Sequence, residues 1–179
     1  MINQKIICTM LVSLLLSACA TAPDIEDMVV DAEAGEGLAF HRNLQNKIIV
    51  TSVEGGDETN PLWTSEIESE GFKSALVESL KTAGLLSAEE HAAGYQMSVK
   101  ILAVDQPGFG FDMTVSAVVE YKLASMSTDE VVFNETLKSE YTATMDDAFY
   151  GPERLKIANE GAVKQSIKML LEELAALRF

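Results

Sequence analysis

The sequence offers few side chains of the kinds that catalyse reactions or hold metal ions. Only two histidines and two cysteines stand among its 179 residues, and metal sites built on such ligands usually need three or four of them together. His91 follows Glu89 and Glu90, but the other histidine, His41, stands far from it in the chain. A lone histidine beside glutamates is typical of solvated surface sequence. We therefore expect no metal ion and no cofactor.

Asp146 and Asp147 are adjacent carboxylates that could serve as an acid–base pair or bind a cation. They also precede Pro152, where a helix is expected to begin, and the positive end of a helix dipole favours acidic side chains there. We favour this second interpretation, because it requires no ligand. The sequence also contains no nucleophile elbow, no zinc-protease motif and no phosphate-binding glycine loop. We expect the protein not to be an enzyme.

Cys19 is the residue whose chemistry the sequence indicates most clearly. An apolar run at residues 6–16 follows Lys5; it is too short for a bilayer span of about 17–25 residues but fits a cleaved signal peptide. Residues 16–19, Leu-Ser-Ala-Cys, resemble the bacterial lipobox, whose cysteine is acylated and becomes the mature N-terminus. The resemblance implies a lipoprotein signal peptide at 1–18 and a lipidated Cys19. The alternative is an ordinary secretory signal with a cysteine at this place by chance.

Cleavage before Cys19 changes both the cysteine count and the charge. Cys8 leaves with the signal, so the mature chain keeps one cysteine, which carries lipid and forms no disulfide. Loss of Lys5 leaves 12 basic and 28 acidic side chains, a net charge of -16. Such a charge repels phosphate backbones, so we expect no nucleic-acid partner. Acyl chains anchor the protein to a membrane, and by resemblance to sorted lipoproteins Ala20 favours the outer membrane.

The length of the chain fits one domain with short appendages. Residues 19–45 hold no helical or strand period for long and are rich in acidic side chains. We interpret them as a lipidated N-terminus followed by an extended acidic tether, since such linkers repel themselves. Met28, Val29 and Val30 could instead dock on the domain. We expect a single folded domain over residues 46–179.

The first half of this domain is expected to contain a strand and a helix. The β-branched run at 47–53 predicts the strand. Ser65 and Glu68 have capping-box spacing and predict the start of the helix. Gly84 is expected to end it, because glycine readily adopts the left-handed conformation that closes a helix.

The second half predicts three strands and a long helix. Apolar and polar residues alternate along three runs, at 95–103, 111–123 and 131–143, with Glu135 interrupting the last one as a bulge would. Helical spacing of apolar residues then extends from Pro152 almost to Phe179. The order β-α-β-β-β-α predicts an α+β two-layer sandwich, in which two helices cover one face of a four-stranded, mostly antiparallel sheet.

Two aromatic residues are candidate partner contacts. Phe109 stands between Gly108 and Gly110 in the expected turn of the first hairpin, and Trp63 stands just before the first helix. Exposed, either side chain could anchor a partner. Aromatic residues beside regular elements commonly fold back over the core, and for Phe109 we favour this buried interpretation, because its glycine neighbours let the backbone bend inward.

The stretch from Phe72 to Leu177 resembles a group of small proteobacterial lipoproteins. The resemblance rests on Tyr95, on the hairpin residues 106–108 and 112–115, and on a set near the last helix: Asp147, Ala148, Phe149, Gly151, Arg154, Ala158, Glu160 and Ala162. Such proteins are often labelled UDP-N-acetylglucosamine acyltransferases, but those enzymes resemble hexapeptide-repeat β-helices, and this sequence has no six-residue repeat. The element order is also similar to that of LptE-like accessory lipoproteins of envelope transport, a likeness of topology.

These observations together predict a periplasm-facing lipoprotein without enzymatic activity. We expect it to bind another envelope protein in assembly or transport. An enzyme that acts on a lipid or sugar intermediate of the envelope is one alternative. A module that binds a small amphiphile between sheet and helices is another.

Overall fold

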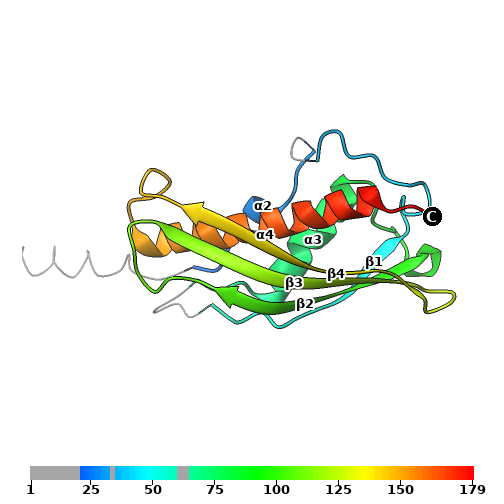
Figure 1. The fold of residues 1–179 in the computed structure, drawn as a ribbon, viewed down its shortest axis with the longest axis horizontal. Coiled ribbons are helices and arrows are strands. Elements are labelled where there is room, and N and C mark those ends of the chain that lie inside the picture. The colour runs from blue at the N-terminus through cyan, green and yellow to red at the C-terminus, as the bar shows by residue number, and fades with distance from the viewer. Residues whose placement is uncertain (1–20, 33–34, 60–64) are drawn as a thin grey trace, which may run out of the picture.

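A four-stranded sheet with helices on one of its faces forms the body of the molecule (Figure 1). The computed structural model describes residues 21–32, 35–59 and 65–179. The strands follow the chain in the order β1-β2-β3-β4, with β1 parallel to β2 and the other pairs antiparallel. Their bounds are Ile48–Glu54 for β1, Tyr95–Asp105 for β2, Met113–Ser125 for β3 and Val131–Ala143 for β4.

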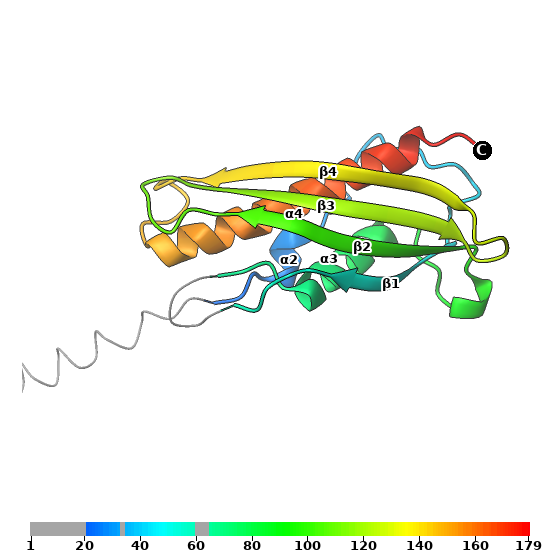
Figure 2. The ribbon, with the colours of Figure 1, turned by 60° about the horizontal axis from the view of Figure 1, so that its bottom comes forward.

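The helices confirm the predicted α+β two-layer arrangement. Helix α3, Ser69–Thr82, packs on β1, and the long helix α4, Gly151–Ala176, packs on β3 and β4 (Figure 2). Two further short elements are α2, Ile25–Met28, and a 3₁₀ turn η2, Glu90–Ala92. No helix within the described ranges is long and apolar enough to cross a membrane.

Strict alternation along β3 explains why one face of the sheet is buried. Every second residue of this strand points into the core, as its buried members show: Met113, Val115, Ala117, Val119, Tyr121 and Leu123. Tyr121 is fully buried; its ring centroid lies 6.4 Å from that of Phe72 on α3, and its hydroxyl lies 2.7 Å from Ser166 Oγ on α4. This one side chain therefore contacts both helices.

Two details of the sheet differ from the sequence prediction. Phe111 does not belong to β3, which begins two residues later, and its side chain is exposed. Glu135 makes no bulge, because it pairs with Tyr121 in regular register; the irregularity lies instead between Leu123 and Ala124. Glu135 faces solvent because β4 is an edge strand, where a charged side chain does not have to be buried.

The start of α3 also differs. The helix begins at Ser69 rather than Ser65, and Glu68 is its N-terminal cap residue without a side-chain capping bond. Glu68 Oε1 instead accepts the Thr59 N–H at 3.1 Å. Ser65 is buried, and its carbonyl accepts a 2.8 Å hydrogen bond from Asn159 Nδ2 of α4. The C-terminal end is as predicted, since Gly84 has a φ of 69° just past the helix.

The segment before Asn46 is not an extended tether over its described part. Met28, Val30 and Leu44 are buried in the hydrophobic core, and the Val30 N–H donates to Ser79 Oγ of α3 at 2.9 Å. The acidic side chains in its described part face outward, while Met28, Val30 and Leu44 pack inward. The docking interpretation of residues 28–30 is therefore correct, and the packed unit extends N-terminal to Asn46.

Candidate functional site

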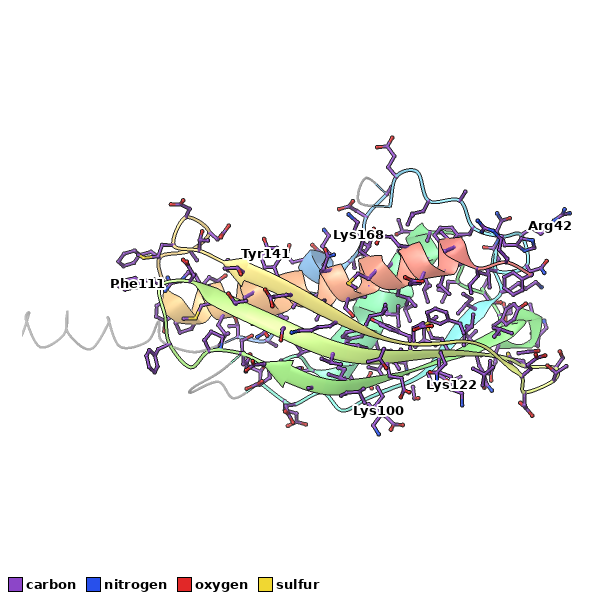
Figure 3. The ribbon with its side chains drawn as sticks, in the orientation of Figure 1. Arg42, Lys100, Phe111, Lys122, Tyr141 and Lys168 are labelled. Carbon is purple, nitrogen blue, oxygen red and sulfur yellow. The ribbon has the colours of Figure 1, made fainter. Side chains whose placement is uncertain are left out.

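Three exposed phenylalanines gather at one end of the sandwich. Phe109 and Phe111 lie in the loop between β2 and β3, and Phe149 lies in the loop between β4 and α4. Their side chains are 92%, 80% and 85% exposed. Figure 3 shows Phe111 at the end of the molecule opposite Arg42. We call these three residues the aromatic tip; a cluster of exposed large apolar side chains usually marks an interaction surface.

Arg154 joins the two loops that carry the aromatic tip. Its Nη1 donates to the carbonyls of Ala148 and Phe149, at 2.8 and 2.7 Å, and its Nη2 donates to the carbonyl of Gly110 at 3.0 Å. The residue is only 5% exposed. Because Gly110 stands between Phe109 and Phe111, one guanidinium fixes the backbone beside all three phenylalanines.

The position of Arg154 is electrostatically unfavourable apart from these contacts. It lies in the first turns of α4, where the helix dipole disfavours a cation, and burial of a charge is costly. Three carbonyl acceptors compensate for the lost solvation of Nη1 and Nη2, whereas the buried Nε has no hydrogen-bond partner. Arginine is suited to this task because its planar group presents several donors in a fixed geometry. The loop clamp accounts for a buried cation at this place.

A turn closed by Asp147 precedes Phe149. Asp147 Oδ2 accepts the Thr144 N–H at 2.7 Å and the Thr144 hydroxyl at 2.9 Å. These hydrogen bonds, the backbone one first, hold the pKa of Asp147 below its ordinary value. Asp146 is exposed, and its N–H donates to Thr144 Oγ1 at 3.3 Å. The Asp147 carboxylate therefore shapes the loop through Thr144, a role that differs from the helix-dipole interpretation of the sequence.

Gln106 ties the other loop to the segment before α3. Its Nε2 donates to Glu66 Oε2 at 2.6 Å. Burial raises the pKa of Glu66, the bond from Gln106 opposes that shift, and the charge of Asp57 adds to it. Both loops of the aromatic tip are thus held by side chains on their inner side, while the phenylalanines face outward.

The expectation that Phe109 folds into the core is wrong. Its neighbour Gly110 is required for a different reason: a Cβ there would lie 2.8 Å from the carbonyl oxygen of Asp112. The glycine allows a close backbone approach within the loop, and this turn carries the Phe109 side chain outward. Phe109 is therefore exposed, as a partner contact must be.

The surroundings of the aromatic tip are acidic. The two loops and their borders carry four exposed aspartates: Asp105, Asp112, Asp146 and Asp147. Residues 105–112 and 144–153 include no lysine and no arginine. The surface therefore combines apolar side chains with negative charge, and it repels anions.

A second polar cluster holds the N-terminal segment on α4. The Asp24 N–H donates to Glu160 Oε1 at 2.7 Å, and Asp24 Oδ2 pairs with Lys156 Nζ at 2.7 Å. Lys156 also lies 3.5 Å from Glu160 Oε1. The carboxylates of Asp24, Asp27 and Glu160 lie close enough together to share a cation. Lys156 already supplies positive charge there, so we assign the cluster to fixing the chain.

The pKa directions in this cluster agree with that assignment. Burial raises the pKa of Glu160, although the Asp24 N–H and Lys156 oppose the shift. Burial also lowers the pKa of Lys156, but the bond to Asp24 and the charges of Glu160, Glu153 and Asp24 outweigh it, so the net pKa is raised. The lysine is thus held in its charged form.

The remaining candidates fall in different places. Cys19 and Trp63 lie outside the described residues. His91, Glu89 and Glu90 are exposed around η2 and belong to no grouping of metal-ligand type in the described part of the chain.

Phe111, Phe149 and Arg154 were not identified as a site from the sequence. A signal was present, since Phe149 and Arg154 belong to the residues on which the family resemblance rests.

The described part of the chain leaves little room for an amphiphile between sheet and helices, because large buried side chains fill that layer. A hollow of about 400 Å³ lies elsewhere, between residues 30–45 and the helices, with Val30, Leu38, Phe40 and Leu171 among its lining. It is outside the layer in which the amphiphile alternative placed its ligand.

Comparison with known proteins shows the fold. No family model and no curated protein matches the sequence. Among solved structures, a putative lipoprotein from Caulobacter crescentus is similar with a TM-score of 0.51 and 12% identity, over 75% of this chain and 90% of that one. Protein XCC0632 from Xanthomonas campestris, of the family DUF330, has a TM-score of 0.56 and 12% identity, over 87% and 94%. At this identity the likeness concerns architecture alone.

Proposed function

We propose that this protein is a lipid-anchored lipoprotein of the bacterial cell envelope, held at the outer membrane and facing the periplasm. It acts without catalysis, as an accessory that binds another envelope protein in assembly or transport. The lipobox-like residues 16–19 and the alanine at position 20 support the anchor and its location. The shared fold with a chain that is described as a putative lipoprotein agrees with this proposal.

The aromatic tip is the observation that carries the proposal of a binding role at the envelope, because it is a contact surface for a protein or for lipid. Three exposed phenylalanines on two loops would be unfavourable in water, yet a buried arginine and a carboxylate-closed turn hold those loops in place. A surface that is apolar, exposed and rigidly supported is suited to binding, because little conformational entropy is lost when it docks.

The buried polar side chains of α4 have structural partners, which also favours a binding role. Arg154 bonds to loop carbonyls, Asn159 to the carbonyl of Ser65, and Glu160 to the N–H of Asp24. Each of these side chains fixes a segment of irregular backbone to the helix. None of the three is thereby presented to a substrate, so we rank the enzyme alternative lower.

Purification of the acylated protein from its native membrane tests the proposal. The tagged full chain should be cross-linked in place, solubilised, and analysed for proteins recovered in constant ratio to it. We expect at least one envelope protein at near-stoichiometric amount, and its loss with the Cys19→Ser variant, which is not anchored. Turnover of envelope precursors by the purified protein, without any stoichiometric partner, would contradict the proposal.

A further inference from the structure

We propose that the aromatic tip inserts into the interfacial layer of a zwitterionic bilayer, in the same leaflet that holds the acyl chains of Cys19. This rests on the proposed lipidation and names what the tip contacts. The tip would then be a second membrane contact, and a protein partner would bind elsewhere on the domain.

The covalent reach of the chain places the anchor close to the tip. Asp24 is fixed to Lys156 and Glu160, which lie within the first three turns of α4; at 1.5 Å rise per residue this is about 8–14 Å from the helix start. Cys19 precedes Asp24 by five residues, so the two Cα atoms are at most about 18 Å apart in any conformation. The N-terminal segment is therefore attached in the half of α4 that lies next to the tip, and a short covalent path leads from there to Cys19.

The arrangement of the elements agrees with this estimate. The loop that carries Phe149 leads directly into α4, and Arg154 in its first turns holds the loop that carries Phe109 and Phe111. In Figures 1 and 2 the first described residues, in dark blue, approach the half of the molecule that holds these loops, whereas the C-terminus lies at the opposite end. The aromatic tip and the point from which the chain leads back to Cys19 thus lie in the same half of the domain.

Phenylalanine side chains on a rigid loop suit the boundary between headgroups and acyl chains. Binding to that layer scales with the apolar area that is buried in it, and exposed aromatic side chains offer large areas. The three tip residues are almost fully exposed, so nearly all of their side-chain area is available. Since two or more acyl chains already anchor a protein stably, the effect of the tip would be to orient the domain.

Charge selects the type of lipid. The four exposed aspartates around the tip, and the lack of basic residues in its two loops, make an anionic lipid surface unfavourable. A zwitterionic surface has no net charge to repel them. The same argument disfavours lipid binding through electrostatic attraction, so the phenylalanines must supply the affinity.

Orientation of the domain is the functional consequence. With the tip in the lipid, the β3–β4 turn and the C-terminus point away from the anchoring leaflet, because β3, β4 and α4 run along the length of the sandwich. The uncovered polar face of the sheet would stand exposed to the periplasm, available to a protein partner.

Fluorescence of the full acylated protein in vesicles tests the inference. In a Trp63→Phe background, the Phe109→Trp variant reports on the tip, and its position is exposed enough to accept the larger ring. The matched control is Met126→Trp, an exposed position in the β3–β4 turn at the other end. Both proteins are reconstituted into vesicles of zwitterionic phosphatidylcholine and phosphatidylethanolamine with brominated acyl chains.

We expect the emission of the Phe109→Trp protein to shift to shorter wavelength and to be quenched by the brominated chains, with no such change in the Met126→Trp protein. Replacing about a third of the lipid by an anionic one should weaken the quenching, and added salt should restore it, because salt screens the repulsion. Unquenched, water-like emission from the Phe109→Trp protein would overturn the inference. So would quenching that occurs only after an envelope protein is added, which would assign the tip to a protein contact.

Failure of the lipid contact at the tip can be distinguished from failure of the proposed lipid anchor. Mass analysis before reconstitution shows whether Cys19 is acylated; an unmodified cysteine refutes the anchor itself. A correctly acylated protein with an unquenched tip refutes only the lipid contact. Recovery of the protein partner is compared between the wild type and a variant with alanine at Phe109, Phe111 and Phe149; lost recovery would assign the tip to the protein contact and overturn the lipid contact.

Discussion

A single buried side chain, Arg154, explains most of the candidate site at the residue scale. Its three hydrogen bonds to carbonyls connect a loop after β2 with a loop after β4, far apart in the sequence. The phenylalanines are exposed because these bonds lie beneath them and hold the backbone from inside. The sequence indicated Phe109 as a candidate but not its exposure, since composition around a turn does not determine which way a side chain points.

The Phe109→Ala substitution should leave the free energy of unfolding within about 0.5 kcal/mol of the wild-type value, because an exposed side chain contributes little packing. As a matched control, Phe72→Ala in the core should cost about 3–5 kcal/mol. Urea unfolding of both variants measures the difference. If Phe109→Ala lowered the free energy of unfolding by several kcal/mol, the Phe109 side chain would have to be buried in the core.

Substitution of Arg154 by lysine should destabilise the fold by about 2–4 kcal/mol, because an ammonium group cannot reproduce the three-carbonyl geometry and buried carbonyls then lack donors. Hydrogen exchange should increase in residues 108–112 and 146–150 together. Hydrogen exchange distinguishes an arginine that links the two loops from one that only packs. If exchange rises in one loop only, or if the Arg154→Lys protein is as stable as the wild type, Arg154 does not link the loops.

At the scale of elements, what could be predicted depended on periodicity. The strands and α4 have long, regular alternation or helical spacing, and these patterns led to the α+β sandwich that the structure shows. The predicted start of α3 at Ser65 was wrong, because Glu68 bonds to the loop residue Thr59 instead of completing a capping box. The prediction for the N-terminal segment was wrong because its buried residues, such as Met28 and Leu44, lie far apart in the sequence and form no regular period.

The docking of the N-terminal segment can be tested by a matched pair within α2. Met28 is buried in the core, so Met28→Ala should lower the free energy of unfolding by about 2–5 kcal/mol. Ile25 lies in the same helix with its side chain exposed, so Ile25→Ala should change it by no more than about 0.5 kcal/mol. Equal, small effects on denaturant unfolding would show that the segment is a detached tether after all.

Contact between β3 and α4 through Tyr121 predicts a loss of stability at high pH. Burial raises the pKa of Tyr121 far above its ordinary value, and the bond with Ser166 offsets only part of the shift. Above about pH 10 the unfolded chain therefore releases this proton while the folded protein keeps it. Stability should then fall as pH rises, by up to about 1.4 kcal/mol per pH unit from this group.

The Tyr121→Phe variant isolates that contribution, because it keeps the ring and removes the hydroxyl. Denaturant unfolding at a series of alkaline pH values should show a shallower decline for the variant than for the wild type. Identical slopes would mean that Tyr121 ionises as readily in the folded protein as in the unfolded chain, and hence that its hydroxyl is not buried between β3 and α4.

At the scale of the whole molecule, the structure has two distinct ends. One end presents the aromatic tip, and α4 beside it fixes Asp24, from which the chain leads back toward Cys19. The other end carries the β3–β4 turn and the C-terminus. The polarity of the domain relative to its proposed anchor could not be predicted from the sequence, because it depends on which helix the N-terminal segment packs against.

The proposed location and orientation of the protein depend above all on the anchor at Cys19. Its most direct test is the mass of the N-terminal peptide of the protein isolated from its own membranes. We predict that the mature chain begins at Cys19 and carries acyl groups on that residue, with residues 1–18 absent. An N-terminus at another position, or an unmodified Cys19 in membrane-bound protein, would contradict the lipid anchor and the orientation inferred from it.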